Sequence, residues 1–536
     1  MQTMIYNPLQ EFESKYKNAH AEYTDLFFEK LVQRSGVDIA QNRETVKRYD
    51  AYREQLSQLT KKRNWLRFFR VLMCISILLI PVVILKMTPK IRALKAEIED
   101  ADKCAEELLA QAYKQMLPLN NSFTDRDALN IIETTIPMLS FEKRLSVRQE
   151  ADMKINYDFC EYNDNEQSTV DVLAGHYNEN PFLFENKLIH TMGMETYHGQ
   201  KTIYWTETYR DSNGKLQTRR RSQTLHATVT KPKPFYNTRV ILNYCSQGGP
   251  DLSFSRDASH LDQKSDKEIE RFVKRGEKKL KKKTDRAISQ NGDFMSMSNS
   301  DFEVLFDALD RTNEVQFRTL FTPLAQTNMV ELIRSKVGYG DDFNFIKTKR
   351  TNRILSKHSQ GRVINLLPNH YGSYSFDQIK ANFTGRNAEF FKAVYFDFAP
   401  LWAVPMYQER PVHSLKPIPD YSQRYSLKEC EALANVVDCK YVVHPNTKTH
   451  AILKSSFVCS KDDVDETCIT AYSYDIEKRV DFVAVYGGDG HYHDVPVEWD
   501  DYLPLEASNH FYISTSEIAK NKSVIARRNG LCIFNT

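Results

Sequence analysis

The sequence contains none of the short motifs that mark common catalytic sites. It has no Gly-x-Ser-x-Gly or His-Glu-x-x-His pattern, and no glycine-rich loop followed by Lys-Ser/Thr. It has no fixed-period repeat and no low-complexity tract, and its formal net charge is only +3 over 536 residues. A strongly basic or strongly acidic protein is therefore excluded. The missing motifs weigh against an enzyme without excluding one, and we expect no cofactor.

Cysteine pairs of the Cys-x-x-Cys type are also missing. The nine cysteines are odd in number and dispersed, which is typical of a protein that is kept reduced. Cys430 and Cys439 have the same Cys-x8-Cys spacing as Cys459 and Cys468, and it matches no known zinc site. We favour buried thiols here, and two disulfides are the alternative if this part of the chain lies outside a cell.

One long apolar run interrupts a chain that is otherwise polar, with a mean hydropathy of −0.54. The run extends from Val71 to Leu85 and contains no charged residue. A helix of this length covers roughly 22 Å, and aromatic and basic flanks extend it toward the roughly 30 Å core of a bilayer. We therefore predict a transmembrane helix over residues 67–87. The residues expected to form the membrane anchor are Trp65, Phe68, Val71, Leu72, Ile75, Leu78, Leu79, Val82, Val83 and Leu85.

The same run predicts where the protein is located. We expect a single-pass membrane protein whose residues 67–87 contact the lipid bilayer, because a soluble core helix does not need basic residues crowded at both ends. A small excess of Lys and Arg before the run places the N-terminus in the cytoplasm. The alternative is a helix buried in the core of a soluble domain, which shorter apolar runs usually form.

Helical patterns surround the apolar run. Apolar residues recur at spacings of three and four from Leu9 to Leu31, so residues 1–66 are expected to form a helical region. Residues 90–117 follow the run and carry a heptad seam, which predicts a weak coiled coil that joins two copies of the chain. The alternative is a helix that packs against its own domain. The seam residues are Ile91, Leu94, Ile98, Ala101, Ala105, Leu108 and Ala112.

The clearest strand signal is a hairpin in the middle of the chain. Thr202–Arg210 alternates between apolar and polar residues, and Lys215–Thr230 returns after a turn at Asn213–Gly214. A two-residue turn at that position pairs residues whose numbers sum to 427. Glu207 would then lie opposite Arg220, where the two side chains form a salt bridge across the strands.

Mixed helix and strand patterns predict two α+β domains with antiparallel sheets, over residues 122–337 and 343–536, divided at Gly338–Asp342. In the first domain, the prolines of Lys231–Pro234 are expected to end the hairpin strand, because proline cannot donate to a ladder. A capping box at Ser265–Glu268 is expected to begin a helix. In the second domain we expect a helix at Leu427–Val437 and strands at Ala393–Tyr407, Lys440–His444, Ala451–Val458, Val480–Tyr486 and Phe511–Ile513.

Seven cations occur within ten residues near the middle of the chain. They are Lys274, Arg275, Lys278, Lys279, Lys281, Lys282 and Lys283. A basic helix attracts the phosphates of anionic lipids or nucleic acids, so this segment is a candidate binding site. Arg219–Arg221 offers a smaller basic face on the predicted hairpin. For both clusters the alternative is a solvated surface that binds no ligand.

The loop Gly487–Asp494 contains residues that are able to bind a metal. Two-residue spacing in a strand would place both of its histidines on one side, and a further ligand would come from His444 or His450. The glycines of the loop fit a hairpin turn equally well, and we favour the turn. The candidate metal ligands are Asp489, His491 and His493.

Three segments after the apolar run are similar to segments of known proteins. Tyr204–Tyr209, Thr230–Tyr236 and Phe396–Leu401 resemble parts of uncharacterised membrane-anchored proteins of Gram-positive bacteria and mollicutes. The resemblance implies a protein of the bacterial cell membrane. It includes no catalytic motif, so it implies neither a reaction nor a ligand.

Three functions agree with these patterns. The one we favour is a non-enzymatic, membrane-anchored binding or scaffold protein with a protein partner. The second is a membrane-tethered, metal-dependent hydrolase that uses residues 487–494. The third is a protein that binds anionic lipid or nucleic acid through residues 274–283.

Overall fold

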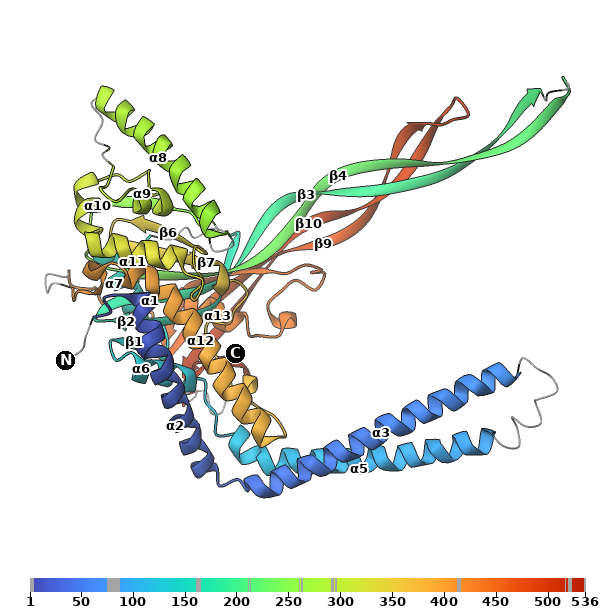
Figure 1. The fold of residues 1–536 in the computed structure, drawn as a ribbon, viewed down its shortest axis with the longest axis horizontal. Coiled ribbons are helices and arrows are strands. Elements are labelled where there is room, and N and C mark those ends of the chain that lie inside the picture. Colours follow the sequence, from blue (N-terminus) through green and yellow to red (C-terminus); the bar gives the residue numbers. More distant parts are fainter. Residues whose placement is uncertain are drawn as a thin grey trace.

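A computed structural model of the chain combines helices with two antiparallel sheets, which confirms the predicted α+β class (Figure 1). The structure describes residues 4–74, 87–160, 165–210, 212, 214–259, 261, 264–290, 294, 296–411, 416–515, 517–518 and 523–534. A body that contains both sheets gives rise to two long projections. One is a helical hairpin and the other is a pair of β-hairpins, and both extend toward the same side of the molecule (Figure 1).

The elements follow one another without a simple alternation of helix and strand. In chain order they are α1 (Pro8–Glu11), η1 (Phe12–Tyr16), α2 (Lys17–Ser35), α3 (Ile39–Cys74), α5 (Thr88–Asn120), α6 (Asp127–Thr135), β1 (Leu139–Phe141), α7 (Val147–Tyr157), β2 (Gln167–Tyr177), β3 (Asn180–Arg210), β4 (Leu216–Cys245), β5 (Ser253–Arg256), α8 (Asp266–Ser289), α9 (Ser300–Phe306), α10 (Glu314–Leu320), α11 (Pro323–Arg334), β6 (Phe343–Thr348), β7 (Thr351–Ser356), η5 (Lys357–Ser359), η6 (Pro368–His370), α12 (Phe376–Trp402), η7 (Pro405–Gln408), α13 (Leu427–Ala434), η8 (Cys439–Tyr441), β8 (Ile452–Lys461), β9 (Val464–Tyr486), β10 (Tyr492–Thr515), β11 (Val524–Arg528) and β12 (Leu531–Phe534).

The N-terminal helices pack against α12 through aromatic rings. The Phe12 ring lies 4.9 Å from that of Tyr395, and the Phe28 ring lies 5.4 Å from that of Phe383. Gly36 ends α2 in the left-handed region, with φ of 64°, which glycine adopts without a steric cost. The predicted helical N-terminal region is confirmed, although the turn at Gly36 divides it.

Helices α3 and α5 form the helical projection, and they pack antiparallel along each other (Figure 1). Leu56 of α3 contacts Ala101 and Ala105 of α5 in a small apolar cluster. Small alanine side chains let the two helices approach closely. The heptad seam of residues 91–112 is thus covered by α3 of its own chain, which is the alternative that the sequence left open. Association of two copies through this seam stays a prediction.

The predicted transmembrane helix requires a correction. Within residues 4–74 and 87–534, as far as the structure describes them, no helix is both long and apolar enough to cross a bilayer. A single crossing would also place α3 and α5 on opposite sides of a membrane, whereas they lie side by side. The single-pass assignment, the membrane localisation and the orientation derived from it are therefore wrong.

The predicted anchor residues are only partly visible. Trp65, Phe68 and Val71 lie on α3 with 61%, 64% and 63% of their surface exposed, and Leu72 belongs to the same helix. The remaining anchor residues lie outside the described part of the chain. They are Ile75, Leu78, Leu79, Val82, Val83 and Leu85.

The first sheet has seven strands in the order β1-β2-β3-β4-β7-β6-β5. Strands β3 and β4 continue far beyond the body as the first β-arm (Figure 1). Glu207 pairs with Arg219 rather than with Arg220, so the predicted register is wrong by one residue. The reason is the connection, because five residues separate Arg210 from Leu216 instead of two. Glu207 forms its salt bridge diagonally, to Arg221 at 2.8 Å.

Strand β4 does not end at the prolines of Lys231–Pro234, as the sequence predicted. Pro232 pairs with Met194 and Pro234 with Met192 within a continuous ladder. The prolines are two residues apart, so both face the same edge of the strand. Among the described strands, β4 pairs with β3 alone over this stretch. Its other edge therefore needs no N–H donor, and proline is tolerated there.

The second sheet has five strands in the order β11-β12-β10-β9-β8. Strands β9 and β10 extend as the second β-arm, which lies along the first (Figure 1). Ile203 and Leu225 of the first arm pack against Val495 and Val497 of the second. Helix α13 covers this sheet near the position that the sequence predicted. The predicted strand at Lys440–His444 is wrong, since a 3-10 turn lies there.

The largest error of the secondary-structure prediction concerns the end of helix α12. The segment Ala393–Tyr407 was expected to be a strand, but residues 393–402 form the last part of α12, and all ten are buried. A helix that is apolar on every side has no amphipathic period, so its pattern cannot be told from that of a buried strand. The predicted boundary at Gly338–Asp342 also does not separate two sheets, because β6 and β7 pair with β5 and β4.

Candidate functional site

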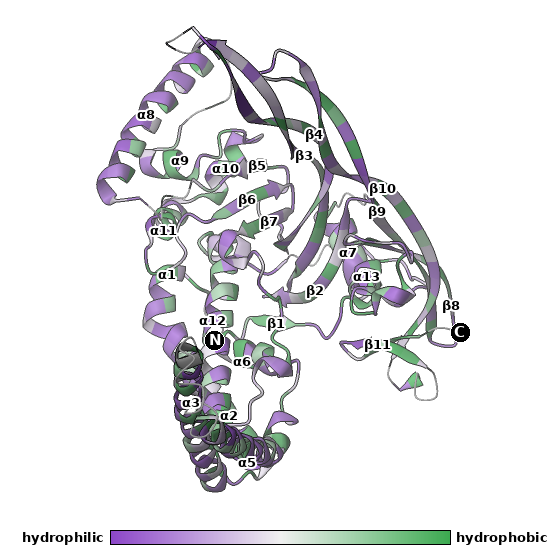
Figure 2. Cartoon of the chain, turned by 90° about the vertical axis from the view of Figure 1, so that its right-hand side faces the viewer, coloured by the Kyte–Doolittle hydropathy of each residue, from purple (hydrophilic) through white to green (hydrophobic). Residues whose placement is uncertain are grey.

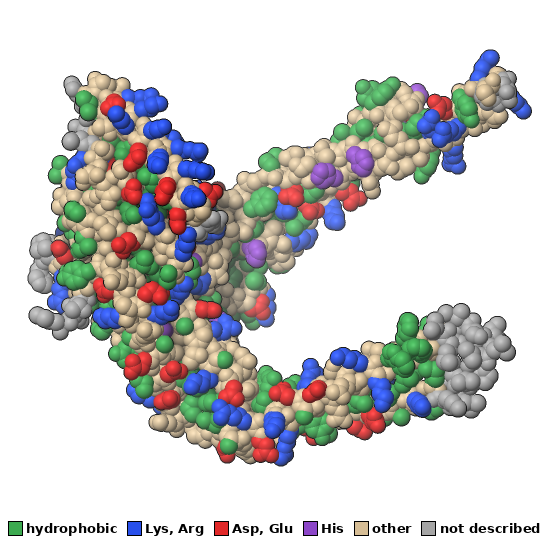
Figure 3. Space-filling model, viewed as in Figure 1, with side chains coloured by type: hydrophobic (Ala, Val, Ile, Leu, Met, Phe, Trp, Pro, Cys, Tyr) green, Lys and Arg blue, Asp and Glu red, His purple; other side chains and the backbone are tan. Residues whose placement is uncertain are grey.

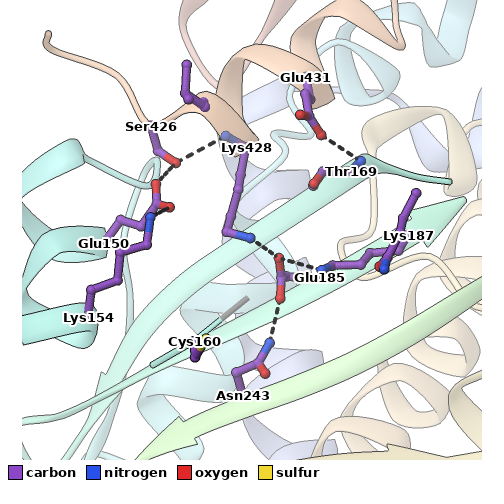
Figure 4. A network of polar contacts seen from close by, with 12 residues as sticks. Glu150, Lys154, Cys160, Thr169, Glu185, Lys187, Asn243, Ser426, Lys428 and Glu431 are labelled. Atoms are coloured by element: carbon purple, nitrogen blue, oxygen red, sulfur yellow. Dashed lines mark hydrogen bonds and ion pairs between the residues drawn. The ribbon is translucent and has the colours of Figure 1, made fainter. Parts of the chain in front are cut away.

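A buried network of charged side chains lies where α13 meets β2, β3 and α7 (Figure 4). At its centre is Glu185 of β3, which is 2% exposed. Its carboxylate accepts hydrogen bonds from Lys428 at 2.7 Å and from the Asn243 amide at 2.6 Å, and the Lys187 ammonium lies 3.7 Å away. One carboxylate is thus held between two lysines, of which Lys187 lies on strand β3 and Lys428 on helix α13.

Two further carboxylates complete this network around a cavity of about 130 Å³ (Figure 4). Glu150 of α7 pairs with Lys154 at 2.5 Å and accepts from the Ser426 hydroxyl. Glu431 of α13 accepts from the Thr169 backbone N–H at 3.0 Å, and the Lys454 ammonium lies 3.2 Å from it. A buried charge is tolerated when it is paired and hydrogen-bonded in this way.

The network joins the two sheets and does not resemble a catalytic centre. Each of its three glutamates is already paired with a lysine, so none is left as a general base. Lys428 and Glu185 are separated by 243 positions in the chain. No spacing rule connects residues that far apart, so this site was not predictable from the sequence.

A polar cluster around His358, under α12, was also absent from the predictions. The His358 Nδ1–H donates to the Asp342 carboxylate at 2.7 Å, and the His358 ring stacks on Tyr339 with the centroids 3.8 Å apart. The Ser359 hydroxyl donates to Asp397 at 2.8 Å, not to the imidazole. Because no histidine in the described part of the chain is placed to take the hydroxyl proton, this arrangement does not activate a serine nucleophile.

Helix α8 presents the predicted basic segment to solvent. A capping box begins the helix as predicted, since the Glu268 carboxylate accepts from the Ser265 backbone N–H at 2.9 Å. Ile269, Val273 and Leu280 are buried. Lys and Arg side chains gather along one flank of α8 (Figure 3), and the helix is hydrophilic over most of its length (Figure 2).

Six of the seven predicted cations form what we call the basic face of α8. All six side chains are exposed. Because each residue turns an α-helix by about 100°, these six positions lie within an arc of about 160° around the helix axis. None of the six forms an ion pair with another described residue. Lys283 differs, because its ammonium donates to the Leu309 carbonyl at 2.5 Å and burial lowers its pKa. The basic face consists of Lys274, Arg275, Lys278, Lys279, Lys281 and Lys282.

The arginines of the first β-arm contact other side chains, whereas the cations of the basic face of α8 form no ion pair with a described residue. Arg221 pairs with Glu207, and the Arg220 guanidinium lies 5.4 Å from the centroid of the Tyr204 ring. Arg219 stands opposite Glu207 in the ladder. The three arginines therefore lie on both faces of a narrow ribbon rather than on one continuous surface.

The loop Gly487–Asp494 is the tip of the second β-arm. Its Gly488 N–H donates to the Gln223 side chain of the first arm at 2.7 Å. His493 bonds to Asp489 at 2.9 Å, but the described residues contain no group of three His, Cys, Asp or Glu side chains placed to hold a metal. The structure therefore brings two of the three candidate ligands together and adds no further ligand from His444 or His450.

The cysteines that the structure describes form no disulfide with one another. Cys430 is buried, as expected, whereas Cys439 and Cys459 are exposed. The prediction of buried thiols thus holds for only part of the Cys-x8-Cys pairs. Burial raises the pKa of the Cys430 thiol, because a thiolate there would be cut off from water.

Comparisons with known proteins leave this geometry without a relative. The chain matches no protein-family model, no curated protein and no solved structure. The fold is that of an α+β protein in which a charged network joins two sheets and the basic face of α8 faces solvent. Its function has to be inferred from these features.

Proposed function

We propose that the chain is a non-enzymatic binding protein that holds a nucleic acid on the basic face of α8. The observation that carries the proposal is a row of six exposed, unpaired cations on one side of a single helix. From Lys274 to Lys282 the helix rises about 12 Å. That length matches three to four phosphates of one strand at about 3.4 Å each.

The attraction of this surface for phosphates comes from its own cations and not from the charge of the whole chain. The whole chain has a formal net charge of only +3, so the attraction has to come from clustering. Glu277, the one acidic residue between Lys274 and Lys283, accepts from the Ser300 hydroxyl at 2.9 Å. Its hydrogen bond directs the carboxylate toward α9 and away from the basic face.

The packing of α8 favours a nucleic acid over a bilayer. An amphipathic helix that lies on a membrane buries its apolar face among the lipid chains. Here that face is already used, because Val273 and Leu280 are buried in the protein. At Gly276 the helix comes so close to α9 that an added Cβ would lie 2.2 Å from Val304. Only charge is left for binding, and phosphate contacts alone supply most non-specific nucleic-acid affinity.

Fluorescence anisotropy of a labelled 20-nucleotide single strand tests the proposal on the full chain. The variant Lys274→Glu/Lys278→Glu/Lys281→Glu reverses three charges at the centre of the basic face. The control Lys47→Glu/Lys114→Glu/Lys380→Glu makes the same change in net charge at three exposed helical lysines elsewhere. We expect the first variant to bind at least about tenfold more weakly, which corresponds to 1.4 kcal/mol, and the control to bind within about twofold of the original chain.

The same variants distinguish the other outcomes. Equal loss of affinity in both variants would show a net-charge effect and contradict a site on α8. Binding to vesicles that contain phosphatidylserine, without binding to the oligonucleotide, would replace the nucleic acid by anionic lipid as the partner. Circular dichroism confirms that each variant is folded before its affinity is compared.

A further inference from the structure

A cavity of about 370 Å³ lies between the bases of the two β-arms, and it shares no lining residue with the cavity of the charged network. Its walls come from β3 and β4 of the first sheet and from β8, β9 and β10 of the second. The volume is within the usual range for pockets that bind small organic molecules. Nothing in the proposed nucleic-acid binding uses this cavity.

Aromatic rings form much of its wall. The His190 ring lies 5.3 Å from Tyr236 and 5.5 Å from Tyr474. Tyr472 is two residues from Tyr474 on β9, so both side chains face the same side of the strand. Aromatic faces carry negative partial charge and attract organic cations that come within about 6 Å.

The charges around the cavity have the sign that suits a cation. Glu166 and Glu506 are among its lining residues, and no described lining residue is Lys or Arg. The nearest lysine along β8 is Lys454, whose ammonium is directed to Glu431 at 3.2 Å. An anion entering the cavity would meet the carboxylates of Glu166 and Glu506.

The buried Nε2 of His190 lacks a hydrogen-bond partner within the described part of the chain, and a ligand could supply one. His190 is 9% exposed, and its Nε2 has no hydrogen-bond partner among the described residues. Burial lowers the pKa of His190 while Glu166 acts against it. A neutral imidazole can present a lone pair at that nitrogen, which an N–H of a bound ligand would satisfy. A buried nitrogen without a hydrogen-bond partner destabilises the fold, and a ligand that supplies the partner removes that cost.

We propose that this cavity binds an organic ammonium ion that carries at least one N–H, held by the tyrosine rings, Glu166 and Glu506, with His190 accepting a hydrogen bond. The ammonium belongs either to a small free amine or to a lysine side chain of a peptide. The chemistry is the same in both cases, because each presents a short alkyl chain that ends in a cation. The proposal is independent of the basic face of α8.

Saturation-transfer NMR on the full chain measures the affinity of suitable probes. The probes are n-butylammonium, its neutral counterpart butan-1-ol, and a blocked glycine pentapeptide with lysine at its centre. We expect the better of the two ammonium probes to bind at least tenfold more tightly than butan-1-ol. Preference for the amine assigns a free small molecule, and preference for the peptide assigns a side chain.

Matched variants link the binding to the cavity. Glu506→Gln and Tyr474→Leu are expected to weaken ammonium binding about threefold to tenfold each. The controls Glu498→Gln and Tyr492→Leu, at exposed positions of the second arm, should change nothing. Glu506 is exposed, so its isosteric variant tests the site even if Tyr474→Leu does not fold. Equal affinity for the amine and the alcohol, or no binding of either ammonium probe, would overturn the proposal.

Discussion

Lys428 of α13 donates a 2.7 Å hydrogen bond to Glu185 of β3, and both side chains are buried where the two sheets meet. Removing one member of such a pair leaves the other charged and desolvated, which costs about 3–5 kcal/mol. We expect Lys428→Met to lower the free energy of unfolding by about 3 kcal/mol, measured by urea denaturation.

Two further variants decide whether pairing explains that loss. Lys440→Met breaks an exposed pair with Asp438 and should leave the urea midpoint unchanged. Lys187→Met/Lys428→Met/Glu185→Leu removes the carboxylate together with both lysines beside it and should recover part of the stability. If this triple variant is less stable than Lys428→Met alone, the cost does not come from an uncompensated carboxylate.

His20 gives the stability a dependence on pH. Its ring is 2% exposed and stacks on Phe391 with the centroids 4.0 Å apart, and burial lowers the pKa of His20 to about 4. The unfolded chain takes up this proton near pH 6.5, so unfolding is favoured as the pH falls from 6.5 toward 4. Over that range the loss from this residue is about 3 kcal/mol.

The substitution His20→Gln should flatten this dependence. Denaturation at pH 7.5 and pH 4.5 measures it, and His198→Gln, at an exposed histidine of the first β-arm, should leave the dependence as it was. Equal pH slopes for the original chain and His20→Gln would show that His20 is protonated in the folded state.

Gly199 permits the two β-arms to lie in contact. A Cβ at this position would lie 2.1 Å from the Pro496 carbonyl oxygen, so Gly199→Ala should push the second arm away from the first. We expect backbone amides of residues 480–499 to exchange about tenfold faster, which corresponds to 1.4 kcal/mol of lost docking energy. Gly385→Ala meets nothing within 4 Å and should leave exchange in the arms unaltered.

The thiols should react in two groups. Cys160, Cys439 and Cys459 are exposed, so a maleimide reagent should label them in the folded protein. Cys245 and Cys430 are buried, and burial raises the pKa of both thiols, so they should react only after unfolding. Mass spectrometry of peptides assigns the sites. A Cys430–Cys439 or Cys459–Cys468 disulfide would contradict the free thiols and restore the alternative that the spacing allowed.

Local features were predictable where the residues that determine them lie within one short segment of the sequence. The capping box at Ser265–Glu268 and the apolar stripe of the N-terminal helices depend on spacings of three and four, and both are confirmed. The hairpin of β3 and β4 was found for the same reason. Its register was missed because Asn213–Gly214 suggested a two-residue turn, whereas the strands are joined by five residues.

Features that depend on tertiary packing were not predictable. The apolar segment Ala393–Trp402 has no period because α12 buries it on every side. The apolar run after Val71 suggested a single crossing of a membrane. No short stretch of the sequence indicates that α5 packs antiparallel along α3. The charged network and the His190 cavity join residues more than 200 positions apart. The basic face of α8 was visible in the sequence, because all of its residues lie on one helix.

The salt dependence of oligonucleotide binding tests the proposed function most directly. A single strand whose three to four phosphates lie along the basic face should show a slope of log affinity against log salt of about −2 to −3, at about −0.7 per phosphate contact. For Lys274→Glu/Lys278→Glu/Lys281→Glu we expect about −1 or shallower. The same slope for both proteins, or affinity that does not change with salt, would contradict binding through the basic face of α8.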